Sequence, residues 1–143
     1  FRSVLSKASL EAKILEVTKQ RKIIELSEQC EEAIMSGFTS AALGTPYIYD
    51  SEQVDQINLI GAVSSTAPSP VEIGGYTIYY ACRNVATGIK EYHPHSHFQL
   101  RQILADGAQV KLGFLQVFHF KRLEIEGCTT VEQVNAIIWS VPW

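Results

Sequence analysis

The sequence contains no run of about eighteen apolar residues, the length that a membrane-spanning helix requires. We therefore expect no membrane span. The formal net charge is −3, with 12 Lys and Arg residues against 15 Asp and Glu residues, so the basic excess of a nucleic-acid-binding protein is missing. The chain also begins with Phe1 instead of Met and opens with no apolar secretory segment. We expect it to be a piece of a longer polypeptide.

Cysteine is scarce, because Cys30, Cys82 and Cys128 are the only three and they form no Cys-x-x-Cys pair. This spacing excludes a zinc ribbon and a thioredoxin-type redox motif. We expect three reduced and mostly buried thiols, and a disulfide between two of them remains an alternative. The motifs of phosphate-binding loops, dinucleotide-binding turns and serine-nucleophile elbows are also absent from the sequence. We therefore predict no catalytic residue and no enzyme activity.

Glycine and proline are absent from residues 8–36, which are rich in helix-forming residues. Apolar residues recur there at steps of three and four, at Leu10, Ile14, Val17 and Ile24. Arg21 occupies one position of this seam. Such a helix would be roughly 43 Å long, more than the rest of a small domain could cover. We predict that residues 1–36 are an oligomerisation arm that forms a trimeric coiled coil; a single amphipathic helix on its own core, or two helices, are the alternatives.

Residues 37–143 are predicted to form a compact α+β domain of short helices and two small β-hairpins. Hydrophobic residues make up 46% of the chain and charged residues 19%, which is typical of a globular domain. The expected hairpins span 38–49 and 76–92. Ser96 and Gln99 form a capping box, and helices are expected at about 51–63, 97–105, 110–126 and 130–139. We expect Asp106-Gly107 to break the middle two apart, because glycine permits a positive φ.

Two segments of the chain resemble a domain family at the C-terminal ends of bacteriophage tail fibre and baseplate-associated proteins. The matching residues are Tyr47, Tyr49, Asp50, Ser51, Asn58, Leu59 and Gly61, and then His95, Ser96, Gln99, Leu100, Asp106 and Gly107. The resemblance covers roughly residues 21–139. It implies a structural component of the virion, in a tail fibre, baseplate or tail tip, that passes through the host cytoplasm during assembly. It also implies other tail or baseplate proteins as partners, and a role in attachment to the host.

Three of the four histidines lie within five residues, at His93, His95 and His97. Side chains two apart on an extended segment share one face, and imidazole is a good ligand for iron or nickel. In a homotrimer, His95 and His97 of three chains would supply six nitrogens around the symmetry axis. This predicts a metal site shared between chains. The alternative is a surface turn in which His95 hydrogen-bonds the hairpin.

Tyrosines supply a second candidate site. Those left exposed could stack on sugar rings or on a partner protein, and we select Tyr76 and Tyr80 as a candidate binding surface. Together with the Ser-Ser-Thr-Ala-Pro-Ser-Pro segment, they favour an alternative function as a receptor-binding tip that reads a host surface glycan. A metal-dependent hydrolase built on the histidines is the least favoured reading, because Glu91 is the only carboxylate near His95 in the sequence.

Overall fold

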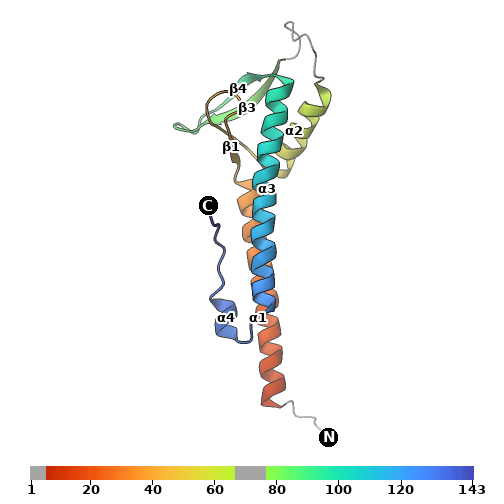
Figure 1. The fold of residues 1–143 in the computed structure, drawn as a ribbon, viewed down its shortest axis with the longest axis vertical. Coiled ribbons are helices and arrows are strands. Elements are labelled where there is room, and N and C mark those ends of the chain that lie inside the picture. The colour runs from red at the N-terminus through yellow and green to blue at the C-terminus, as the bar shows by residue number, and fades with distance from the viewer. Residues whose placement is uncertain (1–5, 67–76) are drawn as a thin grey trace. The chain divides into compact units, whose positions relative to one another are not determined.

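The computed structural model describes residues 6–66 and 77–143, and it contains both helices and a sheet (Figure 1). The elements in chain order are α1 (Lys7–Met35), β1 (Phe38–Ser40), β2 (Tyr47–Tyr49), α2 (Gln53–Ser65), β3 (Ile78–Asn84), β4 (Lys90–His95), α3 (His97–Glu126) and α4 (Val131–Asn135). The predicted α+β class and the long N-terminal helix are confirmed. Across the described residues, no helix has both the length and the apolar character needed to cross a membrane.

The chain divides into two compact units. One contains Phe1–Glu32 together with Phe114–Trp143, and the other is Ala33–Gly113. This division differs from the predicted boundary at residue 36, because the second half of α3 and the short helix α4 belong with α1. Their shared core consists of Leu26, Ile125, Val134 and Ile137.

The described residues of the unit 33–113 form a four-stranded antiparallel sheet with the strand order β1-β2-β3-β4. Both predicted hairpins are present, and they are joined by the pairs Tyr47↔Asn84 and Ile48↔Arg83, which the sequence analysis did not anticipate. Positive φ values at Gly44 (98°) and Gly88 (71°) permit the tight turns between β1 and β2 and between β3 and β4. The sheet therefore places residues from two distant hairpins side by side.

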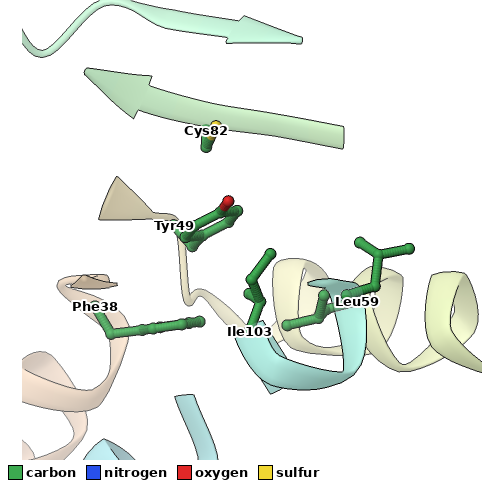
Figure 2. Close-up of a cluster of buried hydrophobic side chains, with 6 residues drawn as sticks. Phe38, Tyr49, Leu59, Cys82 and Ile103 are labelled. Carbon is green, nitrogen blue, oxygen red and sulfur yellow. The ribbon is translucent and has the colours of Figure 1, made fainter. Parts of the chain in front are cut away.

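One face of this sheet packs against α2 and the first half of α3. The buried residues are Phe38, Tyr49, Leu59, Cys82, Leu100 and Ile103. Figure 2 shows Tyr49 between the strand that carries Cys82 and the helices that carry Leu59 and Ile103. The predicted capping box begins α3: the Ser96 N–H donates to Gln99 Oε1 at 2.8 Å, and the Gln99 N–H donates to Ser96 Oγ at 3.2 Å.

The predicted break at Asp106-Gly107 is wrong, because α3 runs without interruption from His97 to Glu126. Gly107 has no positive φ. A Cβ atom added to it would lie 2.7 Å from Cζ of Phe38 and 2.8 Å from its Cε1. Glycine at this position therefore lets the aromatic ring of β1 lie directly against the helix backbone.

The predicted ends of the shorter helices also need correction. The N-cap of α2 is Glu52, whose backbone N–H donates to Asp55 Oδ2 at 3.0 Å, whereas the helix was expected to start at about residue 51. Thr130 caps α4, close to the expected start at about residue 130, and its side chain accepts a hydrogen bond from the Gln133 N–H. The α4 helix ends at Asn135, however, and does not continue to residue 139.

Candidate functional site

His95 and His97, the two predicted metal ligands, are buried in the unit formed by residues 33–113. Their exposed fractions are 0% and 5%. His95 Nε2 lies 2.8 Å from the Tyr49 hydroxyl, and His95 Nδ1 lies 2.6 Å from the carbonyl oxygen of His93. His97 Nδ1 lies 2.7 Å from the Thr66 hydroxyl. Both nitrogens of His95 are thus engaged and neither ring is open to solvent, which argues against the predicted site shared between chains.

The same geometry gives a prediction about metal content. Among the described residues, no group of three or more His, Cys, Asp and Glu side chains is arranged to hold a metal ion. We expect elemental analysis of the purified protein to find iron and nickel well below one ion per three chains. We also expect a chelator to leave the melting temperature unchanged. Stoichiometric metal that is lost in His97→Ala, but kept in the His119→Ala control, would contradict this prediction.

The hydrogen bonds of His95 define its tautomer. The carbonyl of His93 can only accept, so Nδ1 carries the proton and donates to it. Nε2 is left to accept from the Tyr49 hydroxyl. Burial of the ring lowers the pKa of His95 below its usual value, and burial raises the pKa of Tyr49. This neutral pair connects β2 to the end of β4 inside the core.

We expect the free energy of unfolding to fall as the pH drops below about 6.5, the usual pKa of histidine. The groups that face the imidazole are Tyr49, Tyr80 and His93. Because the folded pKa of His95 is lowered, the unfolded chain binds the proton first. The stabilising contribution is therefore complete above the unfolded pKa, and it is lost progressively as the pH falls from there through the lower folded pKa.

Urea denaturation at a series of pH values tests this dependence. The His95→Gln variant should be less stable, and the slope of its stability between pH 7 and pH 5 should be smaller than that of the wild type. His119→Gln is the matched control, because His119 is exposed on α3. If His95→Gln keeps the wild-type slope, the buried imidazole is not the titrating group.

Of the two tyrosines selected from the sequence, Tyr76 lies outside the described residues and Tyr80 is only partly exposed. The Tyr80 ring lies 5.9 Å from that of His95 in the core, and its hydroxyl donates to the carbonyl of Asp55 at 3.4 Å. Burial raises the pKa of Tyr80 to about 12. Within residues 6–66 and 77–143, the exposed tyrosines are instead Tyr79 (67%) and Tyr92 (73%). Strand alternation explains this, because Tyr79 lies on the opposite sheet face from Tyr80.

A charged cluster that the sequence did not predict lies beside Tyr92. Arg83 donates to both carboxylate oxygens of Asp50, from Nε at 2.8 Å and from Nη2 at 3.1 Å. Lys90 Nζ donates to the same carboxylate at 2.8 Å. The hydrogen bond from Arg83, together with that from Lys90, lowers the pKa of Asp50 to about 2. Asp50 follows β2, whereas its partners lie on β3 and β4, so only the joined sheet brings them together.

This cluster borders two neighbouring depressions in the surface. The first has a volume of about 140 Å³ and is lined by Asp50, Asp55, Asn58, Tyr80, Ala81, Lys90 and Tyr92. The second, of about 300 Å³, shares Asp50, Asp55 and Lys90 with the first. It is completed by Met35, Glu52 and Arg83. Aromatic rings and groups of both charges therefore surround one polar concave surface.

A different surface lies on α1, in the unit that contains Phe1–Glu32. Leu26 and Cys30 of this helix are 0% and 3% exposed. The residues of the predicted seam are exposed, namely Leu10 (50%), Ile14 (50%), Val17 (49%) and Ile24 (58%). At about 100° per residue, these four lie within roughly 40° of Leu10 around the helix axis, whereas Leu26 and Cys30 lie about 160° away. The helix therefore has two apolar faces on opposite sides, and the part of the chain that the structure describes covers only one of them.

Comparison of the chain with protein-family models, with curated proteins and with solved structures finds no match in any of the three. The fold and its surfaces define the protein at the level of a class. It is an α+β chain with an uncovered apolar seam on its long N-terminal helix and a polar, aromatic depression beside its sheet.

Proposed function

We propose that this protein is a structural component of a bacteriophage tail and assembles as a homotrimer through α1. The observation that carries the proposal is the exposed seam of Leu10, Ile14, Val17 and Ile24, opposite the face that packs within the chain. Leaving four large apolar side chains half exposed along one stripe is costly in water. Burying the exposed half of each side chain against another helix would stabilise an assembly by roughly 1 kcal/mol per side chain.

The spacing of the seam supports a second copy of the same helix as its cover. From Leu10, steps of four, three, four and three residues lead to Ile14, Val17, Arg21 and Ile24. In a heptad repeat, Ile14 and Arg21 then occupy a positions, and the other three occupy d positions. β-branched residues at d disfavour a two-stranded parallel coil and favour three or four strands. A polar residue such as Arg21 at an a position restricts the register in which the helices pair.

The virion part of the proposal rests on the resemblance to phage tail fibre and baseplate-associated domains. Its matching residues make specific contacts within residues 33–113: Tyr49 with His95, Asp50 with Arg83, and Ser96 with Gln99. These contacts join β2, β3, β4 and the start of α3. Such residues maintain a fold and need no reaction to explain them, which supports a structural protein over an enzyme. Its partners are then other tail or baseplate proteins, and its location is the virion.

Light scattering of the purified chain tests the assembly. We expect a mass close to three times the 15.9 kDa of one chain at micromolar concentration. A monomer that is fully helical would contradict the proposal, and a stable dimer would contradict the trimer. The virion assignment is tested separately, by mass spectrometry of purified phage particles produced from a genome that encodes the chain. Absence of its peptides from intact particles would overturn that part alone.

A further inference from the structure

The depression beside Asp50 has an exposed aromatic ring at one edge. Tyr92 on β4 is paired with Ala81 on β3, so a small side chain stands opposite the ring. Tyr92 is 73% exposed although it lines the depression. The next pair on the same sheet face is Arg83 with Lys90. An open aromatic face thus lies beside charged hydrogen-bonding groups.

Several polar groups around this ring have unused hydrogen-bonding capacity. Lys90 Nζ has three donors, and among the described residues it bonds only Asp50. Asp55 Oδ2 accepts from the Glu52 N–H at 3.0 Å, while Oδ1 has no partner among the described residues. The Asn58 amide forms no hydrogen bond to any other described residue, and it can both donate and accept. Donors and acceptors therefore converge on the same small volume.

The charges of the two depressions nearly balance. Arg83 and Lys90 both bind Asp50, and Asp55 and Glu52 carry two further negative charges nearby. The two depressions therefore have a slight excess of negative charge, which disfavours an anionic ligand. A ligand that suits these depressions is neutral, bears several hydroxyl groups and presents one apolar face to an aromatic ring.

We propose that this depression binds a neutral saccharide. The apolar face of one sugar ring stacks on Tyr92, as aromatic side chains do with flat apolar surfaces. Its hydroxyl groups donate to the carboxylates of Asp50 and Asp55 and accept from Lys90 and Asn58. All of these groups belong to residues 33–113, so the inference does not depend on the trimer. It adds recognition of a surface glycan to the structural role proposed above.

The test uses the full chain and three probes: glucose, galactose and N-acetylglucosamine, each titrated at millimolar concentration. We expect at least one of them to shift the backbone amide NMR signals of Asn58, Lys90 and Tyr92 in a saturable way. Tyr92→Ala should weaken this binding about tenfold, since it removes the stacking ring. Tyr79→Ala is the matched control, because Tyr79 is 67% exposed but lines neither depression. It should leave the affinity unchanged.

Asn58→Leu provides a second variant, on α2 instead of β4. It should lower the affinity for the same sugar, and thermal melting should show that the fold is intact. An array of neutral oligosaccharides extends the test to larger ligands. The proposal is overturned if no probe shifts these signals and no oligosaccharide on the array is bound. It is equally overturned if Tyr79→Ala and Tyr92→Ala weaken binding alike, or if cross-linking in assembled particles shows a protein covering Tyr92.

Discussion

Replacing Ile14 and Val17 together with aspartate is expected to convert the assembly into monomers that remain helical. In the isolated chain both side chains are about half exposed, at 50% and 49%, so the charges cost little in the folded monomer. In the proposed seam each aspartate would be buried against apolar neighbours without a cationic partner, at a cost of several kcal/mol per charge. Because each 1.4 kcal/mol is a factor of ten, the trimer should weaken by roughly a thousandfold or more.

The matched control adds the same two charges to the same helix on the side opposite the seam, as Ala8→Asp with Ala12→Asp. Both of those residues are exposed. Sedimentation measures the oligomeric state, and circular dichroism measures the helix content of each variant. The seam is misassigned if the control dissociates as readily as the Ile14 and Val17 variant, or if that variant remains a trimer.

The second large effect is expected at Gly107, where alanine should destabilise the fold even though the position is helical. Alanine normally stabilises a helix interior by about 1 kcal/mol relative to glycine. Here its Cβ would lie 2.7 Å from the Phe38 ring. Overpacking of this kind costs about 1–3 kcal/mol. We therefore expect Gly107→Ala to lower the free energy of unfolding by about 1 kcal/mol in urea denaturation.

Gly61 in α2 offers a direct control, because nothing lies within 4 Å of a Cβ added there. Gly61→Ala should raise the free energy of unfolding by up to about 1 kcal/mol. Combining Gly107→Ala with Phe38→Leu should cost less than the sum of the two single changes, since the smaller side chain makes room. If Gly107→Ala proves as stabilising as Gly61→Ala, the close approach of Phe38 is not the reason for this glycine.

Local patterns predicted much of the fold. The absence of glycine and proline over residues 8–36 predicted α1, and Ser96 with Gln99 predicted the start of α3. Contacts between distant segments could not be predicted in this way. The pairing of Ile48 with Arg83 joins the two hairpins, and no local signal marks it. Gly107 was misread for the same reason, because the ring that requires it belongs to a strand far away in sequence.

The candidate sites show the same limit. Histidine spacing drew attention to His95 and His97, but their burial depends on core partners, Tyr49 and Thr66, that lie on other segments. The alternation of β3 would have assigned Tyr79 and Tyr80 to opposite faces. It could not have decided which face meets water, because that is determined by α2 and α3 packing on one side of the sheet.

The two faces of α1 also bear on how such a protein can diversify. The residues of its exposed seam and those of its covered face, such as Leu26 and Cys30, are different positions of one helix. A lineage can therefore change the seam and acquire a new assembly partner without altering the residues on which the chain's own folding depends. Related proteins in one cell could avoid mixed assemblies by diverging at a few seam positions alone. Specificity of association and foldability are then inherited as separate traits.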